Sequence, residues 1–105
     1  MDKIIGFIGT GNMAKAIIGG ILTAKLAQET QIICSNNTSD KLEEAKKAYG
    51  IITTLDNKEV AQKADILFLS VKPQVCQNVI NEIKNVIRNN TIIVSNFNMF
   101  ICYFL

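Results

Sequence analysis

Residues 5–14 read IGFIGTGNMA, an apolar run that stops at Gly9 and continues as the pattern G-x-G-x-x-A. The run predicts a buried strand, and apolar residues at helical spacing over residues 13–24 predict the helix that follows. In such a turn the first glycine permits the tight bend, Gly11 lets the backbone approach a pyrophosphate, and Ala14 allows close packing of helix on strand. The stretch therefore predicts dinucleotide binding at the start of the helix. The alternative is a glycine-rich turn that only reverses the chain.

Strand-like and helix-like segments alternate through most of the remaining sequence. Helix signals are Ser39 or Asp40 as an N-cap, Gly50 as a stop, Asp56 as a second N-cap, and an amphipathic pattern from Pro73 to about residue 88. The expected strands cover residues 3–8, 31–34, 51–54, 66–71 and 91–94. This alternation predicts right-handed βαβ units, and so an α/β doubly wound, mainly parallel sheet of Rossmann type with strand order 3-2-1-4-5.

Composition excludes several classes of function. The chain has 105 residues, of which 49% are hydrophobic and 19% charged, which is typical of a globular domain and not of a disordered chain. The net charge of +2 argues against nucleic-acid binding, and the lack of histidine excludes any site that needs an imidazole. We expect no membrane span, because no apolar run is long enough. The three cysteines form no C-x-x-C pair, so we expect no metal site and a reduced, cytoplasmic setting.

The residues after the second expected strand indicate which dinucleotide is bound. NAD sites usually place an acidic residue there to accept a hydrogen bond from the ribose 2′-hydroxyl. Here residues 35–39 are neutral, and the first carboxylate is Asp40. Neutral donors accommodate a 2′-phosphate without repulsion, so NADP is favoured over NAD, although no arginine stands beside them. The same side chains also suit the cap of the second helix, and both roles can hold together.

A third feature is the sequence SVKPQ at residues 70–74, where the fourth expected strand ends. In an open parallel sheet this end lies beside the switch point at which ligands bind. Pro73 fixes the backbone and turns the chain sharply. Lys72 faces either a phosphate or, as most surface lysines do, the solvent.

Together these segments resemble the N-terminal domain of pyrroline-5-carboxylate reductase. The resemblance covers residues 1 to about 95. It rests on residues 5–14, Gly19-Gly20, Tyr49-Gly50, Asp56-Asn57 and the run ADILFLSVKPQ at residues 64–74.

The resemblance implies an oxidoreductase of proline biosynthesis that reduces the cyclic imine 1-pyrroline-5-carboxylate with NADPH or NADH. It implies that the pyrophosphate is held by Ile8, Gly9, Thr10, Gly11, Asn12 and Met13. It places Asn36 at the adenosine ribose or its phosphate, Asn57 on the adenosine side, and Ser70, Val71, Lys72 and Pro73 at the nicotinamide half. We assign no catalytic residue and no metal ligand.

The sequence departs from the family after the fifth expected strand. There the family continues with a Ser-x-Ala-Ala-Gly turn and a helical domain that dimerises and supplies the substrate pocket, whereas Ser95 is followed here by NFNM. We therefore expect a dinucleotide-binding domain over residues 1–95, an atypical apolar tail over residues 96–105, and a truncated or frameshifted enzyme that is not competent alone. Only the full-length enzyme would then take the imine substrate. The alternative is a stand-alone NAD(P)-binding regulatory module.

The tail carries no charge and is rich in aromatic residues. Such a segment either pairs as an extra edge strand beside the fifth strand or mediates self-association with a second chain. We favour self-association, because the tail lacks the charges and prolines that normally protect an edge.

Overall fold

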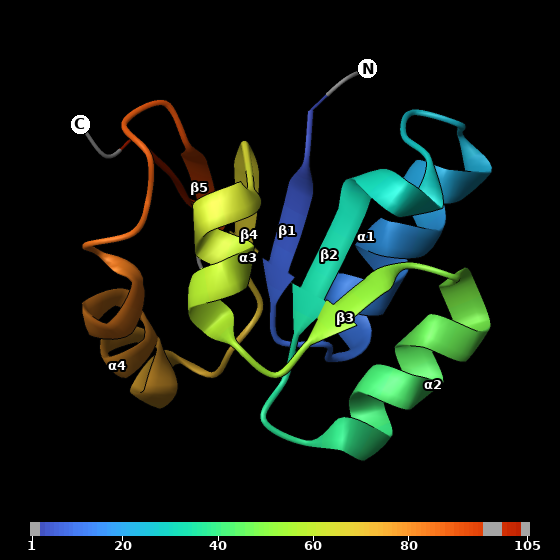
Figure 1. Ribbon diagram of the computed structural model, residues 1–105, viewed down its shortest axis with the longest axis horizontal. Coiled ribbons are helices and arrows are strands. Elements are labelled where there is room, and N and C mark those ends of the chain that lie inside the picture. Colours follow the sequence, from blue (N-terminus) through green and yellow to red (C-terminus); the bar gives the residue numbers. More distant parts are fainter. Residues whose placement is uncertain (1–2, 96–99, 104–105) are drawn as a thin grey trace.

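One sheet of six strands, in the order β3-β2-β1-β4-β5-β6, organises the computed structural model, which describes residues 3–95 and 100–103 (Figure 1). Five strands run parallel, and the sixth is antiparallel to β5. The strands are β1 (Ile5–Ile8), β2 (Ile32–Ser35), β3 (Ile52–Thr54), β4 (Ile66–Leu69), β5 (Ile92–Ser95) and β6 (Phe100–Tyr103). The predicted fold class and the order of the five parallel strands are therefore confirmed.

Helices cover both faces of this sheet. They are α1 (Asn12–Thr23), α2 (Ser39–Tyr49), α3 (Asn57–Lys63) and α4 (Pro73–Ile83), with a short 3-10 turn, η1 (Glu29–Gln31), before β2. The core on one face packs against α1 and α2, and the core on the other packs against α3 and α4. Both faces are apolar because alternate side chains of each buried strand point to opposite sides. None of the helices in the described ranges is long and apolar enough to cross a membrane.

The contact between α3 and β1 is unusually close at Gly6. A Cβ atom on Gly6 would lie 2.7 Å from Val60 Cγ1 and 2.8 Å from Ala64 Cβ. Glycine therefore lets the helix lie directly on the strand. On the opposite face of the sheet, the rings of Phe7 and Phe68 stack with their centroids 4.7 Å apart.

An ionic clamp holds the amino ends of β1 and β4 together. Asp65 Oδ2 accepts a hydrogen bond of 2.8 Å from the Ile4 amide, and Asp65 Oδ1 accepts one of 2.7 Å from Arg88 Nη2. The Ile4 amide first, and then the Arg88 guanidinium, lower the pKa of the Asp65 carboxyl below its usual range. Arg88 also donates to the Ala64 carbonyl oxygen at 2.8 Å.

Some expected boundaries differ in the structure. The last helix was expected to reach about residue 88, but α4 ends at Ile83 and a turn follows it. Val86 and Ile87 still pack against the core, which explains why their spacing looked helical. The N-cap of α2 is Thr38, whereas the caps expected at Asp56 and Gly50 are confirmed.

Part of the tail extends the sheet. Residues 100–103 form β6, in which Phe100 pairs with Ser95 and Tyr103 with Ile92. Two arrangements were expected for the tail, an extra edge strand or self-association, and β6 is the edge strand beside β5. Residues 96–99 and 104–105 lie outside the described residues.

The packing at Gly6 gives a stability prediction. We expect Gly6→Ala to lower the free energy of unfolding by about 1–3 kcal/mol, because the added methyl group overpacks the α3 contact. The matched control is Gly20→Ala in α1, where an added Cβ has no neighbour within 4 Å. This control should raise the free energy of unfolding by about 0.5–1 kcal/mol, since alanine favours helix. Urea unfolding followed by circular dichroism measures the stability of both variants. Equal urea midpoints for Gly6→Ala and the unmodified chain would contradict the close packing of α3 on Gly6.

Candidate functional site

A cavity of about 480 Å³ lies at the carboxyl edge of the sheet. Open α/β sheets bind their ligands at this edge. Its walls come from the end of β1, from the loops after β1, β2 and β4, and from α2, α3 and α4. Its lining residues are Ile8, Gly9, Thr10, Gly11, Asn36, Asn37, Lys41, Asn57, Ser70, Val71, Lys72, Val75 and Val79.

The two glycines of the first turn have different roles. Gly9 has a φ of +100°, and a Cβ there would lie 2.4 Å from the Ser70 carbonyl oxygen. Glycine is therefore required at Gly9 by the protein itself. At Gly11 an added Cβ would meet no atom within 4 Å. The space in front of Gly11 is open and faces the cavity, so a ligand can use it.

The start of α1 suits an anion. Gly11 is the N-cap of this twelve-residue helix, no side chain caps the first turn, and no acidic residue lies in it. The first backbone N–H groups of a helix have no partner within the helix, and they carry partial positive charge. An anion in the cavity beside Gly11 would meet these groups.

Asn36 joins the glycine turn to the loop after β2. Its Nδ2 atom donates to Thr10 Oγ1 at 2.6 Å, and its Oδ1 atom accepts from the Thr38 amide at 3.0 Å. Thr10 itself is buried. Asn36 thus lines the cavity, but its amide also makes hydrogen bonds within the protein, to Thr10 and Thr38.

Asn57, the first residue of α3, makes a second cross-link. Ser35 Oγ donates to Asn57 Oδ1 at 2.6 Å, and Asn57 Nδ2 donates to Glu82 Oε1 at 2.9 Å. The end of β2 is therefore tied to α3 and α4. Asn57 also lines the cavity.

The charge of the cavity is positive. Lys41 and Lys72 are in its wall, and no carboxylate is among the lining residues. Within the described ranges, the ion pairs join other cations: Lys15 to Glu44, Lys63 to Glu59, and Arg88 to Asp65. The two lysines therefore favour an anionic ligand.

The structure brings most of the predicted site residues together. Ile8, Gly9, Thr10, Gly11, Asn36, Asn57, Ser70, Val71 and Lys72 share this one cavity. Asn12 and Met13 lie in the first turn of α1 and are not among the lining residues, and Pro73 is the first residue of α4.

Sequence reasoning missed Lys41, Val75 and Val79, whereas Asn37 belongs to the neutral stretch of residues 35–39 that was expected beside the 2′-phosphate. The sequence does give an indication for Lys41. A cation in the first turn of a helix is unfavourable because it opposes the helix dipole, so a lysine at this position suggests a role outside the helix. Val75 and Val79 are four residues apart, so they were interpreted only as the apolar face of α4.

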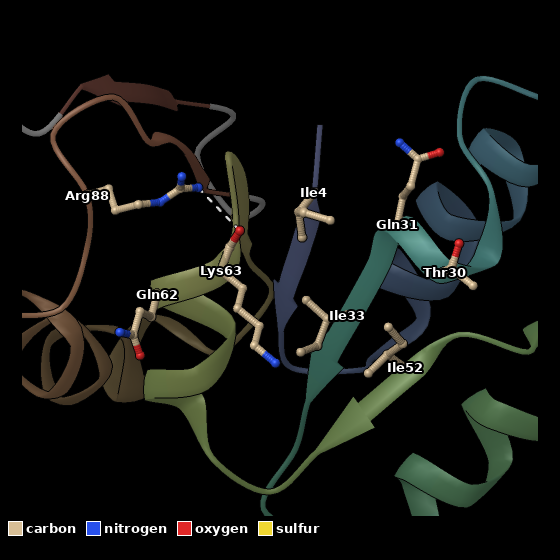
Figure 2. A pocket seen from close by; sticks show the side chains of 8 residues that line it. All are labelled: Ile4, Thr30, Gln31, Ile33, Ile52, Gln62, Lys63 and Arg88. Carbon is tan, nitrogen blue, oxygen red and sulfur yellow. Dashed lines mark hydrogen bonds between the residues drawn. The ribbon is translucent and has the colours of Figure 1, made fainter. Parts of the chain in front are cut away.

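A second, smaller cavity of about 240 Å³ lies at the amino edge of the sheet (Figure 2). Ile4, Ile33 and Ile52 form its apolar part, while Arg88 and Lys63 lie on one side. Both of these cations already have acidic partners. Because ligands of open α/β sheets bind outside the carboxyl ends of the strands, the cavity at the carboxyl edge is the candidate site.

Cys34 and Cys76 do not supply reactive groups. Cys34 is buried in the core against α1 and α2, and this burial raises the pKa of its thiol to about 11. Burial also raises the pKa of the Cys76 thiol. Both thiols are therefore protonated and unreactive near neutral pH. No group of three or more metal-binding side chains occurs among the described residues.

Known proteins match this chain over most of its length. Pyrroline-5-carboxylate reductase of Escherichia coli (strain K12) is 39% identical over 95 residues, which is 90% of this chain and 35% of that protein. The structure of a pyrroline-5-carboxylate reductase from Coxiella burnetii is 33% identical, with a TM-score of 0.84 over 90% of this chain and 35% of that chain. The structure of Plasmodium falciparum pyrroline carboxylate reductase with NADP bound is 26% identical, with a TM-score of 0.75 over 90% of this chain and 33% of that chain.

The chain thus spans about a third of the length of these relatives. The family model described as "NADP oxidoreductase coenzyme F420-dependent" matches residues 4–99. With its parallel sheet, its glycine turn and its positive cavity, the chain belongs to this family of NADP oxidoreductases.

Proposed function

We propose that this chain is the NADP(H)-binding domain of a pyrroline-5-carboxylate reductase, the enzyme that reduces 1-pyrroline-5-carboxylate to proline. The observation that carries the proposal is the open space in front of Gly11, inside a positive cavity and at the uncapped start of α1. The names of the relatives, and the NADP bound to one of them, support the choice of ligand and reaction.

The residues of the cavity fit a dinucleotide phosphate. In this proposal the pyrophosphate lies against residues 8–13, where the α1 amides are available. The 2′-phosphate lies between the Asn36 loop and Lys41, which supplies a cation where no arginine is present. The nicotinamide half lies along residues 70–73, and Asn57 donates on the adenosine side. The bound cofactor supplies the hydride, while the chain orients it.

Substrate binding is assigned to the rest of the enzyme. Because the chain spans about a third of its relatives, we propose that residues 1–95 hold the nucleotide, that residues outside this chain hold the imine, and that the chain alone does not turn over. NAD is accepted as a weaker ligand. A cytoplasmic location belongs to the same proposal, and the free, buried thiols of Cys34 and Cys76 are consistent with it.

Replacement of Gly11 tests the binding site directly. We expect Gly11→Val to weaken NADPH and NADH binding by more than about tenfold, because its side chain would occupy the space of the pyrophosphate. Stability should fall by no more than about 1 kcal/mol, since only the helix cap changes. Calorimetric titration measures binding, and Gly20→Ala is the control that should bind normally. If folded Gly11→Val binds both nucleotides as before, the turn is not the site.

Replacement of Lys41 tests the preference for NADP. We expect Lys41→Gln to weaken NADPH binding by about tenfold and to leave NADH binding nearly unchanged, since only NADPH carries the 2′-phosphate. Lys47→Gln removes the same charge near the other end of α2 and should leave both affinities unchanged. Equal losses for NADPH and NADH in Lys41→Gln would contradict the assignment.

Although residues 100–103 form β6, we propose that the tail also mediates self-association, because β6 is the last strand of the sheet. Further support is the uncharged sequence of residues 96–105. We expect light scattering to give the mass of a dimer or larger species for the full chain, and of a monomer after deletion of residues 97–105. A monomeric full chain that loses stability on this deletion would show that the tail serves only as a strand of its own sheet.

A further inference from the structure

A chain of hydrogen bonds runs from the surface of α4 to the glycine turn. Glu82 Oε1 accepts from Asn57 Nδ2 at 2.9 Å, and Asn57 Oδ1 accepts from Ser35 Oγ at 2.6 Å. The carbonyl oxygen of the same Ser35 accepts from the Gly9 amide at 2.9 Å. Asn57 and Gly9 line the cavity, whereas Glu82 is outside its wall. Within the described part of the chain, Asn57 is the residue that links Glu82 to the cavity.

The chemistry of the three side chains gives this chain a direction. A carboxylate can only accept hydrogen bonds, so the nitrogen end of the Asn57 amide must face Glu82. The oxygen end then faces Ser35, and the Ser35 hydroxyl must donate to it. Since an amide nitrogen carries two hydrogens, one remains available to a ligand in the cavity.

We propose that Glu82 is a positioning residue for the dinucleotide cavity. Its carboxylate fixes which end of the Asn57 amide faces the cavity. It thereby also keeps the oxygen of this amide toward the Ser35 hydroxyl, which donates a hydrogen bond to it. Without an acceptor at Glu82, the Asn57 side chain can turn over and present its oxygen to the phosphates and hydroxyls of the nucleotide. The inference rests on the proposed nucleotide-binding function of this cavity.

A positioning role and a role of charge alone predict opposite effects on NADPH binding when the Glu82 carboxylate is removed. Removing a negative charge near an anionic ligand strengthens binding. Losing the fixed orientation of Asn57 weakens binding, by about three- to tenfold if one good hydrogen bond to the ligand is lost. The direction of the change therefore separates a positioning role from a role of charge alone.

The test uses the full chain, two Glu82 variants, an Asn57→Ala background and one control variant. We expect Glu82→Leu to weaken NADPH binding by about three- to tenfold and Glu82→Gln to weaken it less, because glutamine can still accept from Asn57. In an Asn57→Ala background, Glu82→Leu should cause no further loss. The matched control is Glu29→Gln in η1, which removes one negative charge from an exposed residue before β2 and should leave the affinity unchanged.

A spectroscopic readout in the unliganded protein makes the test independent of binding. The side-chain amide of Asn57 should give one pair of proton–nitrogen resonances in the unmodified chain. Glu82→Gln should broaden or double this pair, since both amide orientations become accessible. Glu82 is exposed, so its variants should fold, and thermal unfolding checks this.

The outcomes separate the two proposals. Tighter or unchanged NADPH binding in folded Glu82→Leu, or an undisturbed Asn57 resonance pair in both Glu82 variants, would overturn the positioning role and leave nucleotide binding intact. If the unmodified chain does not bind NADPH, the proposed function fails, whatever the resonances show.

Discussion

The close approach of three strand ends at Gly9 is the constraint on which the site depends. The Gly9 amide donates to the Ser35 carbonyl oxygen at the end of β2, and the Ser70 amide after β4 donates to the Ile8 carbonyl oxygen at 2.8 Å. Any side chain on Gly9 would collide with the Ser70 backbone. A single position without a Cβ thus lets β1, β2 and β4 converge. The cavity floor is made where they meet, and the fold and the site share this requirement.

Around that floor, polar side chains connect neighbouring elements and face the cavity at the same time. Asn36 reaches from the β2 loop to Thr10, and Asn57 reaches from α3 to Ser35. Neutral amides suit this double use, because each can accept on one side and donate on the other without the cost of burying a charge. The charged groups, Lys41 and Lys72, are at the surface and can be satisfied by solvent or by a ligand.

The sequence was most informative where one residue type is dictated by one local requirement. The glycine turn, the apolar strands and the caps at Gly50 and Asp56 follow from periodicity and backbone geometry, and the order of the parallel strands follows from the alternation of strands and helices. The end of α4 could not be predicted in this way, since Val86 and Ile87 keep a helical spacing although they pack from a turn.

Lys41 was missed because its position in the cavity depends on how α2 leaves the Asn36 loop, which is a tertiary property. The β6 pairing also depends on tertiary context, since an uncharged segment suits pairing within a chain and between chains equally well.

The topology of the sheet also has a consequence for the order of folding. β1 and β4 lie side by side in the middle of the sheet, yet paired residues such as Ile5 and Ile66 are distant in sequence. β5 and β6 are neighbours both in sequence and in the sheet. Because closing a longer loop costs more entropy and contacts between distant residues form late, we expect the β5–β6 pair to form early and the central β1–β4 pair late. The cavity floor is built where β1 and β4 end. We therefore expect the ability to hold a nucleotide to arise late as the chain folds.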